Sequence, residues 1–139
     1  MIKKPIEIEL DASHAVTNEG IHDAEITEVN LRGEGSSKVA VIHVRAENGV
    51  AYLFRLEGVC YFSMDYFGPQ NIISDFLILS GTDVDDLVRE IDDLEKWTLN
   101  RYSDLSVRIK SGELALIKVT PSVGCEICCV CKKVTFGTR

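Results

Sequence analysis

The chain has 139 residues, of which 45% are hydrophobic, and its 22 Asp and Glu against 15 Lys and Arg give a formal net charge of −7. A chain of this length buries a core without a metal or disulfide bonds, and we predict a single domain over residues 1–139. Because nucleic acids and anionic membranes bind clustered basic residues, this composition argues against both as partners.

Nearly all of the negative charge lies in one short segment, residues 83–95, which we call the acidic strip. It holds seven acidic residues and one basic residue, Arg89, and therefore carries −6 of the net charge of −7. The remaining chain is close to neutral. The acidity of this protein therefore has a definite position in the sequence.

The start of the chain does not have the pattern of a signal peptide, because Glu7, Glu9 and Asp11 interrupt any apolar run. No segment approaches the roughly 18 consecutive apolar residues of a transmembrane helix. We therefore predict a cytoplasmic protein, in which the five cysteines stay reduced.

The first elements in chain order have the alternating pattern of strands. Apolar residues at Ile6, Ile8 and Leu10 alternate with acidic ones, and a second strand-like run extends over residues 23–32. The segment 33–37, rich in Gly and Ser, then has the composition of a turn.

Asn48-Gly49 separates two β-rich runs and is typical of a two-residue type I′ turn, because Asn and Gly accept the positive φ angles that this turn needs. We therefore predict a hairpin that pairs Lys38–Glu47 with Val50–Cys60, with Glu47 opposite Val50. In this register His43 lies opposite Phe54. One face then holds Val39, Val41, His43, Phe54 and Leu56, and the other holds Ala40, Ile42, Val44 and Leu53.

The middle of the chain contains an aromatic segment, a strand and a helix. Four of the aromatic residues lie between Tyr61 and Phe67, before a turn that begins at Gly68, and a strand is predicted over Ile72–Leu79. Apolar residues then recur at helical spacing from Val84, which predicts an amphipathic helix over about residues 83–99.

The last third of the chain is predicted as strands over Leu105–Lys110, Glu113–Thr120 and Cys125–Phe136. Ser111-Gly112 is predicted to close a tight hairpin, and Pro121 to interrupt the ladder. The expected fold class is therefore α+β: a mainly antiparallel, curved sheet of seven or eight strands, with one long amphipathic helix (about 83–99) packed on one face.

Four thiols lie within seven residues, at Cys125, Cys128, Cys129 and Cys131. A Cys₄ metal site usually draws its ligands from two separated pairs, because four neighbouring thiols converge only on a looped backbone. Read as a strand, the segment places Cys125, Cys129 and Cys131 on one face and Cys128 on the other. Structural packing is our first interpretation, and metal binding or thiol redox chemistry are the alternatives.

Histidines are the remaining candidates for chemistry. His43 lies in the middle of a predicted strand, and a pocket of the curved sheet near His43 and Tyr52 is our alternative for a small-molecule site. His22 is expected to pin the entry of a strand through a side-chain hydrogen bond. The sequence contains no phosphate-binding loop or catalytic motif, so no catalytic residue is assigned and no cofactor is expected.

A protein-binding surface is our leading interpretation. The acidic side chains of the predicted helix would steer a basic partner toward it, and aromatic residues beside a turn are frequent interface anchors. The candidate contact residues are Asp83, Asp85, Asp86, Glu90, Asp92, Asp93, Tyr66 and Phe67.

A short set of motifs resembles small uncharacterised bacterial proteins, some of which are similar to immunity proteins of polymorphic toxin systems. The motifs are residues 21–26, residues 56–59 and residues 71–75. The resemblance covers residues 21–80 and implies a non-enzymatic domain that neutralises a toxin by binding it. A homodimer formed through an exposed strand or the aromatic segment is also compatible with the sequence.

Overall fold

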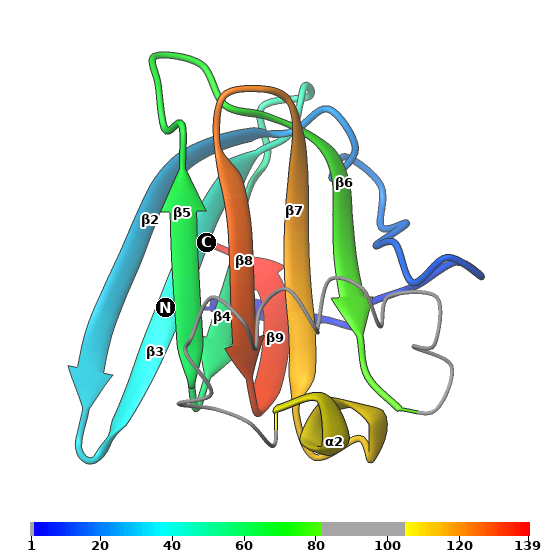
Figure 1. Ribbon diagram of the computed structural model, residues 1–139. Helices are drawn as coiled ribbons and strands as arrows, with labels where there is room; N and C mark the ends of the chain where they lie inside the picture. The colour runs from blue at the N-terminus through cyan, green and yellow to red at the C-terminus, as the bar shows by residue number, and fades with distance from the viewer. Residues whose placement is uncertain (1, 82–104) are drawn as a thin grey trace.

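The computed structural model describes residues 2–81 and 105–139, in which nine antiparallel strands form one sheet (Figure 1). Their order in the sheet is β1-β9-β4-β3-β2-β6-β7-β8-β5. The strands are β1 (Lys4–Ile6), β2 (Glu25–Glu34), β3 (Ser37–Arg45), β4 (Ala51–Glu57), β5 (Tyr61–Asp65), β6 (Ile72–Leu79), β7 (Ala115–Val123), β8 (Glu126–Cys131) and β9 (Lys133–Thr138).

The predicted α+β class is wrong, because the described residues are built almost entirely of strands. Within them α2 (Leu105–Lys110) is the only helix, and its six residues are too few for the long amphipathic helix that we expected to cover the sheet. The segment 83–99, where that helix was predicted, lies outside the described residues. The antiparallel pairing is confirmed, whereas the strand number is nine instead of seven or eight.

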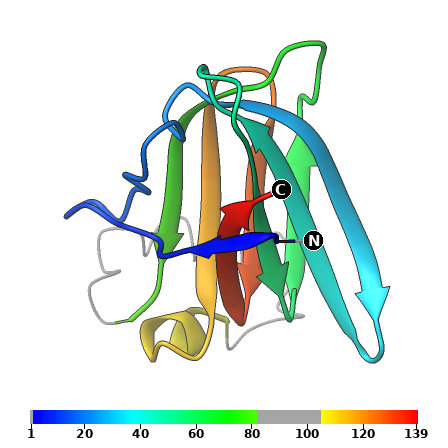
Figure 2. The same ribbon diagram turned by 180° about the vertical axis from the view of Figure 1, so that it is seen from behind.

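The sheet folds over into two layers (Figures 1 and 2). The front layer of Figure 1 contains β5, β8, β7 and β6, and the back layer contains β2, β3, β4 and β9, with β1 along its edge. One residue pair, Glu25 with Ile72, joins the layers between β2 and β6. At the opposite side, β4 leads into β5 and β8 leads into β9 at a common corner, where the Lys132 amide donates to the Glu57 carbonyl at 2.9 Å.

The main core lies between the two layers. Phe54 of β4 stacks on Phe76 of β6 with ring centroids 4.1 Å apart and on Phe136 of β9 at 4.5 Å, so aromatic rings from both layers meet at its centre. Offset aromatic pairs contribute about 0.5–1.5 kcal/mol beyond the area that they bury. A smaller apolar cluster on the outer side of the front layer is covered by Leu105 and Ile109 of α2.

The hairpin of β3 and β4 forms as predicted, but its register differs by one residue. The Ala46 amide donates to the Val50 carbonyl, and Gly49, with φ of +86°, donates to the Ala46 carbonyl, so the loop has three residues instead of two. Asn48 does not adopt the positive φ that a type I′ turn requires. His43 therefore lies opposite Leu53 and not opposite Phe54.

This register exchanges the faces of β4, because side chains alternate along a strand. Phe54 and Leu56 point into the main core together with Ala40 and Ile42. Leu53 instead joins Val39 and Val41 on the outer side of the back layer. The predicted grouping of Phe54 with His43 is therefore wrong.

The segment Leu105–Lys110, predicted as a strand, is the helix α2. Leu105, Val107 and Ile109 alternate in sequence, but only Leu105 and Ile109 are buried, while Val107 is 66% exposed. Burial at positions i and i+4 is the pattern of a helix. Gly112, with φ of +86°, ends the helix by donating to the Ile109 carbonyl, so Ser111-Gly112 is a helix end and not a hairpin turn.

The last predicted strand, Cys125–Phe136, is two strands. The break lies at Lys132, between β8 and β9, where the chain passes from the front layer to the back layer. Pro121 does not end β7 but lies within it, where the register with β6 shifts. A bulge accommodates a proline because one ladder hydrogen bond is already missing there.

Candidate functional site

The turn between β5 and β6, residues 66–71, presents two exposed aromatic side chains, and we call it the aromatic turn. Tyr66 is 79% exposed and Phe67 is 48% exposed. Both side chains, which the sequence offered as candidate contact residues, are therefore exposed at the surface. Tyr66 also has φ of +62°, a conformation that costs a non-glycine residue about 1–3 kcal/mol and persists only where the surrounding structure holds it.

Asn71 holds the aromatic turn in place from inside. Its side chain is buried; its Nδ2 donates to the Gly68 carbonyl at 2.9 Å, and its Oδ1 accepts from the Gly68 amide at 2.9 Å. The same oxygen accepts from the Cys125 amide at 3.0 Å, which ties the turn to the start of β8. One buried side chain thus fixes the backbone next to the two exposed aromatic residues.

Gly124 packs closely against this arrangement. It has φ of +82°, and a Cβ atom there would lie 2.3 Å from the Gln70 carbonyl oxygen and 2.5 Å from the Asn71 Oδ1. A larger residue would therefore push the two loops apart. The close approach of the β7–β8 turn is a second reason why the aromatic turn has a defined shape.

Two acidic side chains lie beside the aromatic turn. Asp65, the last residue of β5, lies directly opposite Glu126 of β8, and both are exposed. Like charges directly opposite each other destabilise an antiparallel pair. Among the described residues neither carboxylate forms an ion pair, so this end of the sheet is negatively charged as well as aromatic.

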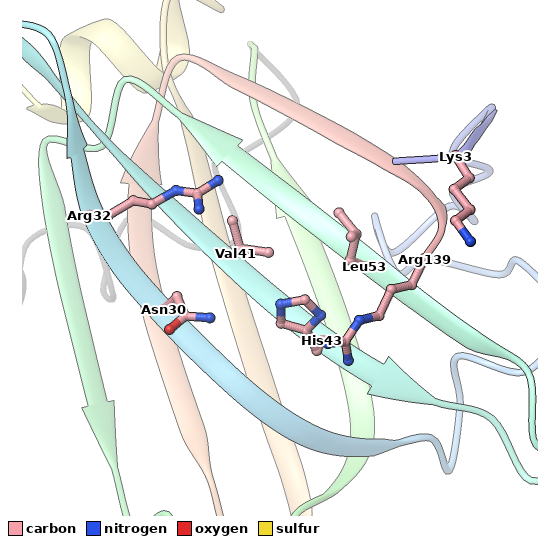
Figure 3. A pocket seen from close by; sticks show the side chains of 7 residues that line it. All are labelled: Lys3, Asn30, Arg32, Val41, His43, Leu53 and Arg139. Carbon is pink, nitrogen blue, oxygen red and sulfur yellow. The ribbon is translucent and has the colours of Figure 1, made fainter. Parts of the chain in front are cut away.

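A pocket of about 420 Å³ lies on the outer side of the back layer, and we call it the basic pocket (Figure 3). Its floor is apolar, formed by Val41 and Leu53, which are almost fully buried. Its lining includes three cationic side chains and no Asp or Glu. The lining residues are Lys3, Asn30, Arg32, Val41, His43, Leu53 and Arg139.

His43 lies at the wall of the basic pocket, with its Nε2 3.4 Å from a carboxylate oxygen of Glu28. Burial of the ring lowers the pKa of His43 below its ordinary value, the charge of Arg139 lowers it further, and the Glu28 carboxylate opposes both effects. The buried Nδ1 has no hydrogen-bond partner among the described residues. The lowered pKa favours the neutral form of the His43 ring, and its Nδ1 is left without a partner.

The structure does not bring His43 and Tyr52 together. Tyr52 lies on the other side of the back layer, where its ring stacks on Phe136 at 5.3 Å. The one-residue difference in hairpin register accounts for this separation. His22 lies elsewhere, and its Nδ1 is 2.7 Å from the Ser74 carbonyl, which is the strand-pinning hydrogen bond that the sequence predicted.

The cysteine cluster follows the alternation of a strand, as predicted. Cys125, Cys129 and Cys131 point into the main core, and Cys128 packs against the smaller cluster on the outer side of the front layer. Among the described residues no group of three or more His, Cys, Asp or Glu has the arrangement of a metal site. Burial and the nearby charge of Asp65 raise the pKa of Cys125 to about 11.

Cys129 is also held in its thiol form. A hydrogen bond with the Cys131 side chain, together with burial, raises the pKa of Cys129. Because the thiolate is the reactive form, these buried positions favour packing over chemistry. Cys60, at the corner between β4 and β5, is half-buried.

Four polar residues of the basic pocket were not predicted from the sequence: Lys3, Asn30, Arg32 and Arg139. They come from three distant segments, and no motif links them in the sequence. Pairing of β1 with β9 brings Lys3 and Arg139 to the same side of the sheet, since the Lys3 amide donates to the Thr138 carbonyl. The other predicted site residues, Asp83, Asp85, Asp86, Glu90, Asp92 and Asp93, lie outside the described residues.

Comparison of the chain with protein-family models, with curated proteins and with solved structures finds no match. No helix within residues 2–81 and 105–139 is long and apolar enough to cross a membrane.

Proposed function

We propose that this protein is a non-enzymatic binding domain for a basic protein partner, with the aromatic turn as part of its contact surface. The observation that carries the proposal is Tyr66, a large side chain that is 79% exposed on a backbone fixed by Asn71. An aromatic anchor that is already held in place loses little conformational entropy when a partner binds.

The acidic residues beside the aromatic turn favour a basic partner. Asp65 and Glu126 repel each other beside the aromatic turn, and a Lys or Arg of a partner placed between them would relieve that repulsion. The acidic strip carries −6 of the net charge of −7, and a chain with this charge favours a basic partner. The resemblance of residues 21–80 to immunity proteins supports, within this class, an inhibitor of a basic toxin.

Replacement of Tyr66 tests the anchor. Immobilised wild-type protein should retain a basic protein from a lysate of the source cells, and raising the salt concentration should release it. Tyr66→Ala should weaken binding of that purified partner by about thirtyfold, the usual effect of losing an interface anchor. Isothermal titration calorimetry measures the change.

The matched control is Val107→Ala on α2, which removes another exposed apolar side chain, 66% exposed in the structure. It should leave the affinity unchanged. Equal retention of the partner by the Tyr66→Ala protein and by wild type would rule out the aromatic turn as a contact surface.

A second experiment tests the acidic strip. Replacement of Asp85, Asp86, Asp92 and Asp93 by Asn should slow association with the same partner by about tenfold at low salt and flatten the salt dependence of the rate. Stopped-flow or surface plasmon resonance measures the rate. The control replaces Glu7, Glu9, Glu19 and Glu47, all exposed, by Gln and removes the same charge elsewhere. Equal association rates for the two variants would reject steering by the acidic strip.

A further inference from the structure

We propose that the basic pocket is a binding site for a small organic oxyanion, a phosphate monoester or a carboxylate with a short apolar group. This site lies on the outer side of the back layer and does not depend on the aromatic turn or on a protein partner. It would add small-molecule binding to the proposed protein-binding function.

The charge of the basic pocket is the first argument. In a chain with net charge −7, three cationic side chains line one pocket that has no Asp or Glu in its lining. Among the described residues neither Lys3 nor Arg139 forms an ion pair, so their positive charges are not neutralised. Arginine side chains bind oxyanions through two parallel N–H groups, which match the spacing of two oxygens in a phosphate or carboxylate group.

The placement of these groups is the second argument. Figure 3 shows the Arg139 side chain extending toward the His43 ring, with Arg32 and Lys3 on either side of the apolar floor. An oxyanion bound between the cations would place its organic group on Val41 and Leu53, which are 3% and 1% exposed. A volume of about 420 Å³ lies in the range of small-molecule sites.

The unused nitrogen of His43 is the third argument. The Nδ1 atom is buried in the pocket wall and has no partner among the described residues, although buried polar atoms are usually hydrogen-bonded. The Nε2 atom lies 3.4 Å from a Glu28 carboxylate oxygen, and the neutral tautomer that carries its proton on Nε2 leaves Nδ1 as an acceptor. A hydroxyl of the ligand, or the proton of a monoprotonated phosphate, would supply the missing donor.

The carboxylates near the pocket do not cancel its charge. Glu28 lies against His43, and Glu34 is shared between Arg55 and Arg32, with its Oε1 3.8 Å from the Arg32 Nη2. Both carboxylates lie beside side chains of the pocket wall, and neither lines the pocket itself. Arg139 and Lys3 are therefore the cations most available to a ligand.

The test uses phenyl phosphate and phenylacetate as probes, each titrated into the full chain at constant ionic strength and followed by calorimetry and by NMR. At least one of the two should bind saturably. Arg139→Gln and Arg32→Gln should each weaken that binding by about tenfold, the loss expected for one charge-assisted contact. Both side chains are exposed, so neither substitution removes part of the core.

Arg45→Gln is the matched control, because Arg45 is exposed on the same sheet, carries the same charge and does not line the pocket. It should change the affinity by less than about twofold. Which probe binds decides whether a phosphate or a carboxylate is the ligand group. No saturable binding of either probe, or an equal loss of affinity in Arg45→Gln and Arg139→Gln, would overturn the proposal.

Discussion

The protonation of His43 depends on its burial in the back layer and on the charged groups around it. The charged groups that face it are Glu28 from β2, which favours its protonated form, and Arg32 and Arg139, which oppose it. Burial is the largest effect, so the pKa of His43 is lower in the folded protein than the ordinary value of 6.5. The folded state therefore binds fewer protons at this site than the unfolded state does.

This difference predicts a pH dependence of stability. As the pH falls below about 6.5, the unfolded state takes up a proton at His43 before the folded state does, so the free energy of unfolding decreases. Above that pH the histidine is neutral in both states and the effect vanishes. Urea unfolding of wild type and of His43→Gln, compared between about pH 7.5 and pH 5.5, measures it.

The wild type should lose more stability on acidification than His43→Gln does. All other titrating groups are common to the two proteins, so the difference between the two pH profiles isolates His43. A steeper loss in the variant would mean that Glu28 outweighs burial and would contradict a lowered pKa of His43.

At the scale of elements, a single buried amide holds the β5–β6 connection. Asn71 bonds to both backbone groups of Gly68 and to the Cys125 amide, so it connects two loops at the same end of the sheet. Exposed loops are usually the least stable parts of a protein. Here the anchoring gives the loop a fixed conformation at the positions that we propose for partner contact.

Asn71→Ala should lower the free energy of unfolding by about 2–4 kcal/mol, because it leaves buried backbone groups without hydrogen-bond partners. Asn48→Ala is the control, since Asn48 is exposed and its side chain accepts from one amide, that of Val50. It should cost less than about 1 kcal/mol. Denaturant unfolding compares the two variants, and similar losses would show that Asn71 does not hold the turn.

At the scale of the whole molecule, the burial of each cysteine depends on its position relative to the core between the two layers. Cys125, Cys129 and Cys131 contribute to the main core, where the layers meet. Cys60 and Cys128 are half-buried. The five thiols therefore divide into two classes by their position relative to the core.

We predict two rates of thiol labelling by Ellman's reagent at about pH 8. Cys60 and Cys128 should react first. Cys125, Cys129 and Cys131 should react slower by a factor of about a hundred or more, because they require opening of the core and, for Cys125, loss of a proton with a pKa of about 11. Mass spectrometry after partial labelling identifies the sites.

Denatured protein is the control, and in urea all five thiols should react at similar rates. Added Zn²⁺ should leave the labelling of the folded protein unchanged. Stoichiometric zinc bound by Cys125, Cys128, Cys129 and Cys131, or rapid labelling of the buried thiols, would instead support the metal or redox alternatives.

The sequence alone determined the elements with strong local patterns. The strand Ile72–Leu79 was predicted with its observed bounds, and the alternation of the cysteine segment correctly separated Cys128 from its neighbours. The position of Tyr66 and Phe67 before a turn made them candidate contact residues, and both are exposed. In each case the pattern lies within a few consecutive residues, so local physics is enough.

Tertiary structure decided the features that depend on contacts between segments far apart in the chain. Three apolar residues alternating from Leu105 fit a strand or one turn of helix, and packing of Leu105 and Ile109 against the front layer selected the helix. The break at Lys132 exists because the chain must pass between layers there. A three-residue loop instead of two placed Leu53 beside His43.

The two candidate sites differ in the same way. The aromatic turn is one continuous segment, and the sequence identified its exposed residues. The basic pocket is assembled from Lys3, Arg32, His43 and Arg139, which meet only because β1 pairs with β9 and because β2, β3 and β4 lie side by side in the back layer. Contacts between residues so far apart in the chain depend on strand order, and no local preference of the chain specifies that order.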